Sequence, residues 1–334
     1  MNRFSLLQAR SIEEASVATR TGPDSSVSLP ILKAGGLDLL DQLKEGLIDP
    51  PQLVNLRTVS DPALRAIGDG RFGALVTLTQ IASSDTVRKS SPVIAKAVAA
   101  AATPQVRNVA TAAGNLLQRP RCWYFRNHQF ECLKKGGSQC FAVEGENRYH
   151  AIFGSGPCHI VHPSNLAPAL MVCDGSVDLV GGDRKTLAIK DLYHLPDPRL
   201  AGGVLTEHNL RPGEVITGIT FKPAPISGFW AVKEKQSFDW PLVFAAVALQ
   251  LEGRSIASAR VVAGAVAPIP WTLPAVEKAL QGVSLDDDAA LRKACAVAVE
   301  GATPMSDNNY KLALLPVAVR RAVLDAAGID PLRG

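Results

Sequence analysis

Four of the six cysteines in this chain are concentrated in one short segment. Within 37 residues lie Cys122, Cys132, Cys140 and Cys158, whereas the remaining 297 residues contain only two. Cysteine thiolates bind soft metal ions and iron-sulfur clusters, and in oxidising compartments cysteines form disulfides. This clustering indicates that the segment binds something through sulfur.

Three kinds of sulfur chemistry compete for this segment. Structural zinc sites usually pair cysteines two to four residues apart, whereas the gaps here are nine, seven and seventeen residues. Disulfides suit secreted proteins, but the opening MNRFSLLQARSIEEA has no apolar run typical of a secretion signal. An iron-sulfur cluster tolerates irregular spacing. The spacing alone leaves all three open, together with unpaired thiols.

The cysteine segment has neither helical nor strand periodicity and is rich in glycine, so we expect a long irregular loop. Loops of this length in compact domains are usually functional. Aromatic residues interleave the cysteines: Trp123, Tyr124, Phe125, Phe130 and Phe141. They would shield a cluster from water, or they fill an ordinary core.

A glycine turn precedes this segment in the chain. An apolar strand at residues 29–34 runs into Gly35 and Gly36 and then into a helix that begins at Leu37. Glycines let a ligand approach the backbone, and a helix start offers free N–H groups, which together suit a phosphate. The alternative is a tight connection without a ligand, and the turn matches neither GxGxxG nor a P-loop.

A second turn of small residues, TAAGN, spans Thr111 to Asn115. It combines hydroxyl, amide and bare backbone donors. Two such turns favour a long ligand with several phosphates or ribose hydroxyls, although Thr111 and Asn115 could only close a turn.

Composition limits the class of protein. The chain has 334 residues, which predicts two or three structural units, and 47% hydrophobic with 20% charged residues is typical of a soluble globular protein. A net charge of +4 without a basic run argues against nucleic-acid binding. No apolar stretch approaches the ~18 residues of a membrane-spanning helix.

Further elements follow from hydrophobic patterning. We expect a strand at 72–82, helices at 92–102 and 162–172, a hairpin at 177–189 and a strand at 214–221. A linker follows at Pro223 and Pro225, then strands at 229–236, 241–253 and 255–266 and helices at 273–280, 285–300 and 310–327. Strands followed by helices predict a small α+β unit whose sheet is covered on one face.

Five motifs together resemble one family. In order they are AGGLDLL, TAAGN, HPSNLAPAL, GAVAPIPW and NNYKLAL. They resemble motifs of the FAD-binding middle subunit of the molybdenum hydroxylases, the family of xanthine dehydrogenase and carbon monoxide dehydrogenase. The resemblance covers essentially the whole chain.

The cysteine segment is similar to an insertion that only some members of that family carry. It resembles the [4Fe-4S]-binding insert of bacterial three-subunit aldehyde oxidoreductases and of 4-hydroxybenzoyl-CoA reductase, and RCWYFRN, YHAI and GPC are closer to the aldehyde enzyme. The resemblance implies a [4Fe-4S] cluster whose ligands are Cys122, Cys132, Cys140 and Cys158. We expect Cys173 and Cys295 to be buried core residues without a chemical role.

The resemblance also implies which residues contact FAD. Along the diphosphate, mostly through backbone N–H groups, would lie Lys33, Ala34, Gly35, Gly36, Leu37 and Asp38. Its second side, or the ribitol, would contact Thr111, Gly114 and Asn115. Ala113 stands where the family has glycine, which makes close backbone approach there less certain.

Three more positions are implied near the cofactor. Asn165 replaces the family's aspartate, so a charged acceptor becomes a neutral amide. Leu210 would pack near the flavin rings, and Lys233 would stabilise the reduced flavin anion, with core packing and a solvated charge as the alternatives. Among the histidines we expect His128, His150 and His159, in or beside the cysteine loop, to be structural, with shielding or tuning of a cluster as the alternative.

The implied fold is α+β: a two-lobed FAD-binding domain of the p-cresol methylhydroxylase and vanillyl-alcohol oxidase type, followed by a small α+β C-terminal domain. The first domain would span residues 1–224, with lobes 1–58 and 59–224 and the cluster insert at 119–160. The C-terminal domain would span 225–334.

The implied function is electron transfer. Substrate would be oxidised at a molybdenum cofactor on a large partner subunit, and electrons would pass through [2Fe-2S] clusters on a small partner subunit to the FAD held here and on to an external acceptor. The partners would form a heterotrimer or its dimer, and no catalytic acid–base residue is expected on this chain.

Two alternatives remain at this point, a reductase of an aromatic thioester and a flavin-free metal-binding scaffold. The chain shows no export signal of its own. It would be cytoplasmic, or periplasmic if exported with a partner that carries a twin-arginine signal.

Overall fold

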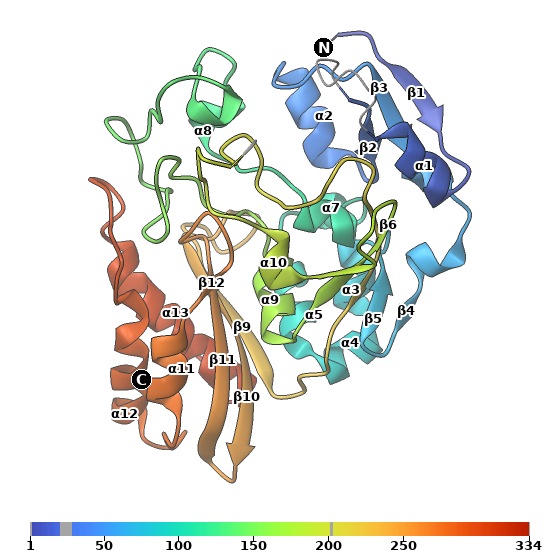
Figure 1. Ribbon diagram of the computed structural model, residues 1–334. Coiled ribbons are helices and arrows are strands. Elements are labelled where there is room, and N and C mark those ends of the chain that lie inside the picture. The colour runs from blue at the N-terminus through green and yellow to red at the C-terminus, as the bar shows by residue number, and fades with distance from the viewer. Residues whose placement is uncertain (1, 21–28, 201–202, 334) are drawn as a thin grey trace.

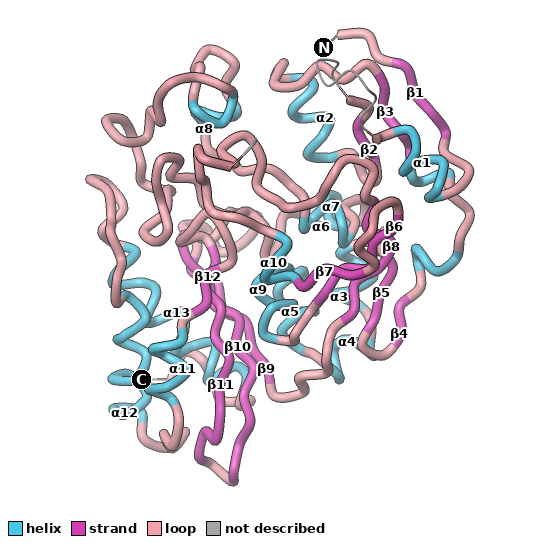
Figure 2. Tube along the Cα trace, in the orientation of Figure 1, coloured by secondary structure: helices cyan, strands magenta, loops and turns pink. Residues whose placement is uncertain are grey.

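The structure is a computed structural model that describes residues 2–20, 29–200 and 203–333. Three separate sheets follow one another through the molecule, and long loops lie along its upper side (Figures 1 and 2). Among the described residues no helix is both long and apolar enough to cross a lipid bilayer.

The first sheet is small and parallel. Its order is β1–β3–β2, with β1 at Ser5–Gln8, β2 at Ile31–Lys33 and β3 at Gln52–Asn55. Parallel strands need crossover connections, and α1 (Ile12–Ala18) and α2 (Leu37–Lys44) lie in these connections. The predicted strand at 29–34 and the helix from Leu37 are thereby confirmed, whereas the sequence analysis missed β1 and β3.

The second sheet has five antiparallel strands in the order β4–β5–β8–β6–β7. In chain order the strands are β4 (Ile67–Gly68), β5 (Arg71–Gly73), β6 (Ser176–Val180), β7 (Thr186–Ala188) and β8 (Val215–Thr220). Buried and half-buried residues alternate along β6, as they do when one face of a sheet packs on a core. The predicted hairpin at 177–189 and the strand at 214–221 are confirmed.

Short helices accompany the second sheet. They are α3 (Leu78–Ser83), α4 (Asp85–Ser90), α5 (Pro92–Ala99), α6 (Pro104–Arg107), α7 (Ala112–Leu116), α9 (Leu166–Val172) and α10 (Ile189–Leu192). Single 3₁₀ turns at Leu56–Thr58 and Pro62–Arg65 connect it to the first sheet.

The strand predicted at 72–82 is wrong over most of its length, because helix α3 begins at Leu78. Thr77 accepts a hydrogen bond from the Gln80 N–H at 3.2 Å, and the Gln80 side chain accepts one from the Thr77 N–H at 2.9 Å. This reciprocal pair is a capping box. It satisfies the free donors of a helix start and outweighs the strand preference of the β-branched residues.

The third sheet and three helices form the C-terminal unit. The antiparallel order is β12–β11–β10–β9, at Trp271–Thr272, Ser255–Gly264, Val243–Glu252 and Ser227–Val232. The helices are α11 (Pro274–Leu280), α12 (Asp288–Ala296) and α13 (Lys311–Ala326), with a 3₁₀ turn at Val297–Val299. They lie together on one side of the sheet (Figure 1), and all three predicted helices are confirmed.

The expectation that this sheet is covered on one face only is wrong. Val243 and Ala245 face the C-terminal helices in one apolar cluster, whereas Phe244 and Ala246 belong to a second cluster shared with α5 and α9. Successive residues of a strand point to opposite faces. Strand β10 is therefore buried on both sides over most of its length, and its apolar run from Val243 to Leu249 is what a doubly covered strand requires.

The segment between α7 and α9 contains the clustered cysteines. Its only regular elements are α8 (Trp123–Arg126) and a 3₁₀ turn at Leu133–Lys135. Figure 2 shows the rest as loop at the upper edge of the molecule. The predicted long irregular loop is confirmed.

Replacing Gly264 by alanine is expected to destabilise the C-terminal unit. Gly264 lies opposite Phe244 on the neighbouring strand, and an added Cβ atom would overlap the buried Phe244 ring. Overpacking of a core costs about 1–3 kcal/mol. Urea unfolding of the purified protein measures this loss. Gly68→Ala is the control, because the nearest atom to its added Cβ is 3.9 Å away; equal stability of the two variants would contradict the packing argument.

Candidate functional site

The two glycine-containing turns meet in space. Strand β2 ends at Lys33, and Gly36 caps helix α2 with a φ of 83°, a conformation that favours glycine. A Cβ atom on Gly35 would overlap the carbonyl oxygen of Val109, which lies just before the second turn. The absence of a side chain at Gly35 thus lets the first turn rest directly on the backbone leading to Thr111.

The second turn is held by its own polar side chains. The Thr111 hydroxyl accepts a hydrogen bond from the Gly114 N–H at 3.2 Å, and the Asn115 side chain accepts one from the Ser164 hydroxyl at 2.7 Å. Thr111 and Asn115 are both buried, and so is Ala113. The methyl group of Ala113 is therefore accommodated within the turn.

Two of the outlying predicted residues converge at the end of helix α5. The buried Asn165 amide donates to the Ala97 carbonyl at 3.3 Å, and the Lys233 ammonium donates to the Ala100 carbonyl at 2.7 Å. Burial lowers the pKa of Lys233. Leu210 is half-buried against the core of the second sheet.

An open cleft of about 600 Å³ lies beside Lys233. The end of α5, strand β9 with the loop that follows it, and helix α13 form its walls, and Arg107 and Phe238 are among the lining residues. The cleft is large enough to admit a planar ring system.

Asp38 does not turn its carboxylate toward the glycine turn. It accepts a hydrogen bond from the Arg119 N–H at 2.9 Å and pairs with Arg121 at 3.0 Å and Arg126 at 2.7 Å. Asp41, one helical turn later, pairs with Arg126 at 2.9 Å. The contribution of Asp38 to a phosphate site would be its main-chain N–H, and its side chain instead anchors the cysteine loop to α2.

The four clustered cysteines line a single narrow cavity. Cys132 and Cys158 are buried, and Cys122 and Cys140 are half-buried. All six cysteines of the chain are free, so no disulfide cross-links this loop. Residues separated by up to 36 positions in sequence therefore present their sulfur atoms to one enclosed space.

Burial and mutual contact determine the protonation of these thiols. Burial raises the pKa of Cys122 to about 11. Cys140 and Cys158 share a hydrogen bond, which lowers the pKa of Cys140 and raises that of Cys158. Because metal ligands must be thiolates, loading of the cavity would release protons.

The cavity does not match a single metal ion. Among the described residues no three His, Cys, Asp or Glu side chains are placed to ligate one ion. In a zinc site each sulfur lies ~2.3 Å from the metal, so all four must crowd together. A [4Fe-4S] cluster instead places each sulfur on a different iron atom, farther from the others. Four thiols from one loop are the donor set that such a cluster uses.

Aromatic rings close one side of the cavity. Tyr124 lies 5.1 Å from Phe130, and Phe130 lies 5.2 Å from Phe141, measured between ring centroids. Tyr124, Phe125 and Phe141 also line the cavity itself. The interleaved aromatic residues therefore form a shield around the sulfur atoms.

His150 also lines the cysteine cavity, with Nε2 3.3 Å from the Cys122 sulfur. Burial and the nearby Lys311 lower the pKa of His150 to about 4, so the ring is neutral at pH 7. His128, by contrast, is exposed. The sequence did not distinguish these two histidines, because only the folded loop brings His150 to a cysteine.

A buried ion-pair network that the sequence analysis missed fixes the other side of the loop. Glu207 pairs with Lys134 at 2.8 Å and with Arg119 at 3.0 Å. Burial raises the pKa of Glu207, but the two cations outweigh it and lower that pKa to about 2. The carboxylate therefore stays charged and links the cysteine loop to the segment before β8.

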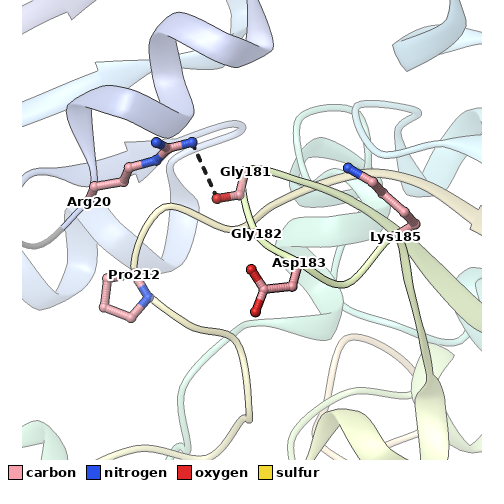
Figure 3. A pocket seen from close by; sticks show the side chains of 6 residues that line it. All are labelled: Arg20, Gly181, Gly182, Asp183, Lys185 and Pro212. Carbon is pink, nitrogen blue, oxygen red and sulfur yellow. Dashed lines mark hydrogen bonds between the residues drawn. The ribbon is translucent and has the colours of Figure 1, made fainter.

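One further hollow contains none of the predicted residues. It is open to solvent and lies between the end of α1 and the β6–β7 hairpin, where Arg20 donates to the Gly181 carbonyl at 3.4 Å (Figure 3). Asp183, Lys185 and Pro212 complete its wall.

Two family models match this chain. Residues 2–224 match the FAD binding domain in molybdopterin dehydrogenase, and residues 229–326 match the CO dehydrogenase flavoprotein C-terminal domain. Among solved structures, reconstituted carbon monoxide dehydrogenase from Oligotropha carboxidovorans superposes with a TM-score of 0.72 at 24% identity over 98% of both chains. That likeness confirms the expected two-domain fold.

Curated relatives give the same result. The aldehyde oxidoreductase FAD-binding subunit PaoB of Escherichia coli K12 is 35% identical over 293 residues, which cover 84% of this chain and 86% of the relative. The carbon monoxide dehydrogenase medium chain of Afipia carboxidovorans is 28% identical over 332 residues, covering 96% and 95%.

The fold, the two family matches and these relatives define a flavin-binding subunit of an oxidoreductase. The chain belongs to the xanthine dehydrogenase family of molybdenum hydroxylases, as an FAD-binding medium subunit.

Replacing Glu207 by glutamine is expected to lower the free energy of unfolding by about 3 kcal/mol at pH 7, because it leaves Lys134 buried without its counter-charge. The folded pKa of Glu207 lies below the ordinary value of 4.5, so the stabilisation is present above pH 4.5 and is lost as the pH falls toward 2. Urea unfolding of both proteins across this range measures the difference.

The control is Glu234→Gln, because the contacts of Glu234 are exposed: an ion pair with Arg148 at 3.9 Å and a hydrogen bond from the Tyr149 hydroxyl at 3.0 Å. This change should alter stability by less than about 1 kcal/mol. A difference between wild type and Glu207→Gln that stayed constant from pH 7 to pH 3 would contradict the ion-pair explanation.

Proposed function

We propose that this chain is the FAD- and [4Fe-4S]-carrying electron-transfer subunit of an aldehyde-oxidising molybdenum enzyme. It would receive electrons from a [2Fe-2S] partner subunit and pass them to an external acceptor. The observation that carries the proposal is the convergence of four cysteines on one shielded cavity, in a loop anchored to the helix that follows the first glycine turn.

The two abutting turns support the placement of the FAD diphosphate. Backbone N–H groups from Lys33 to Asp38 would face one side of it, and Thr111, Gly114 and Asn115 would face the other. Close contact between the turns at Gly35 brings both sets of donors to one place.

The flavin ring would point toward Lys233 and the cleft beside it. FAD supplies one- and two-electron transfer when bound, and this chain contributes position and charge. Lys233, held at the end of α5, would supply positive charge beside the reduced, anionic flavin. Leu210 would pack near the ring, and Asn165 would offer an amide in place of a carboxylate.

The same division into domains is part of this proposal: residues 1–224 with lobes 1–58 and 59–224, the insert at 119–160, and residues 225–334. The partners would be a small [2Fe-2S] subunit and a large molybdenum-cofactor subunit. The identity of 35% to an aldehyde oxidoreductase subunit favours the aldehyde substrate class.

A reductase that feeds electrons inward to an aromatic thioester would use the same FAD and cluster residues. The substrate pocket would lie on the large partner, so the sequence of that subunit separates the two directions. The flavin-free scaffold is disfavoured, because the chain belongs to a family of FAD-binding subunits.

Gly35→Ala is expected to weaken FAD binding at least tenfold, because the added methyl group separates the two turns. The measurement is the dissociation constant for FAD, from flavin fluorescence on titrating the deflavinated enzyme. Gly68→Ala again serves as the control, since its added methyl group meets no close neighbour. Unchanged affinity in Gly35→Ala would place the diphosphate elsewhere.

The complex isolated without oxygen is expected to contain about four iron atoms and four acid-labile sulfides on this chain, beyond those of its partners. Cys132→Ala should lose them, because it removes one ligand of the buried cavity. Cys295→Ala is the control, since Cys295 is buried among C-terminal apolar residues. Iron, sulfide and FAD analysis per chain measures all three, and wild-type protein with flavin but no sulfide on this chain would contradict the cluster.

A further inference from the structure

We propose that His150 donates a hydrogen bond from Nε2 to the Cys122 sulfur and thereby raises the reduction potential of the [4Fe-4S] cluster. His150 is then a positioning residue that tunes the cluster. The inference rests on the cluster assigned to this loop under the proposed function. It goes beyond that function by naming the residue that sets a property of the cluster.

The contact has hydrogen-bond geometry. Nε2 of His150 lies 3.3 Å from the sulfur of Cys122, within the range for a bond to sulfur. The ring packs against Trp123 at 5.8 Å and Tyr124 at 6.2 Å between centroids, which restricts its rotation. His150 is only 3% exposed, so water does not compete for the sulfur from this side.

The direction of this hydrogen bond follows from the chemistry of both partners. A cysteine that ligates iron is a thiolate, which has lone pairs but no proton to donate. The proton must therefore be on Nε2. The other ring nitrogen, Nδ1, is buried and has no partner among the described residues. A neutral imidazole has one N–H group. In this tautomer the N–H is at Nε2 and donates to the sulfur, and Nδ1 has only a lone pair.

The C-terminal unit holds the histidine backbone in place. The carbonyl oxygen of His150 accepts hydrogen bonds from the Asn308 amide at 3.1 Å and the Lys311 ammonium at 2.9 Å. Its N–H donates to Asn147 at 2.9 Å. Lys311 also donates to the Ala265 carbonyl at 2.7 Å. Hydrogen bonds to both the N–H and the carbonyl group of His150 thus hold its main chain in place. They thereby fix the distance of the ring from Cys122.

The effect on potential follows from charge. Reduction adds one electron to the cluster and makes its cysteine sulfurs better acceptors. A donor to one of these sulfurs therefore stabilises the reduced state more than the oxidised state, and burial strengthens the effect. The potential should fall when this donor is removed.

The test uses the complete enzyme complex, purified without oxygen, in wild-type and His150→Leu forms. Iron and sulfide are measured first. A potentiometric titration followed by electron paramagnetic resonance then gives the midpoint potential of the cluster on this chain. We expect His150→Leu to keep its iron and to show a lower potential, whereas His150→Gln, which retains an N–H near the position of Nε2, should recover part of the shift.

His128→Leu is the matched control, because it removes an exposed histidine from the same loop. Its potential should equal that of the wild type. An unchanged potential in His150→Leu with full iron content would overturn the inference while leaving the proposed cluster intact. Absence of iron from the wild-type chain would instead overturn the proposed function.

A second measurement covers a His150→Leu variant that fails to assemble its cluster. Wild-type complex labelled with ¹⁵N-histidine should show a weak nitrogen coupling to the reduced cluster in pulsed electron paramagnetic resonance. That coupling should disappear in His150→Gln. A wild-type spectrum without histidine nitrogen coupling would contradict the hydrogen bond directly.

Discussion

The ion pairs of Asp38 and Asp41 with the arginines of the cysteine loop are the interaction on which the arrangement of this site depends. Helix α2 begins at the first glycine turn, and its two carboxylates meet Arg121 and Arg126 at 2.7–3.4 Å. Since Arg126 is mostly buried, these pairs are shielded from solvent more than an ordinary surface salt bridge. The cysteine loop has little regular structure of its own to hold it in position. These ion pairs attach it to the helix that follows the turn proposed for the FAD diphosphate.

Much of this architecture could be predicted from local sequence signals. The glycine turn before Leu37, the hairpin at 177–189 and the three C-terminal helices each follow from short patterns, and the structure confirms them. The helix at Leu78 was missed, because a capping box of two side chains outweighed a run of strand-forming residues. The cysteine spacing predicted sulfur chemistry but not which side of the loop each sulfur faces.

The features that could not be predicted all involve long-range contacts. The arginines that pair with the Asp38 side chain lie more than 80 residues later in the chain. Glu207 compensates a buried lysine 73 positions away, and a charged residue alone in a sequence does not reveal such a partner. The motif resemblance supplied the candidate residues, and only the folded chain showed that the side chain of Asp38 serves the loop while Lys233 and Asn165 share one helix end.

The apolar cover on both faces of β10 has a consequence for how this protein is made. The surface of α5 and α9 that Phe244 and Ala246 cover belongs to the earlier domain, yet those two residues are synthesised only after that domain. During synthesis that surface stays open to water or to chaperones. Residues outside the flavin-binding half therefore complete its folding. A truncated chain that ended near residue 224 would expose an apolar surface prone to aggregation.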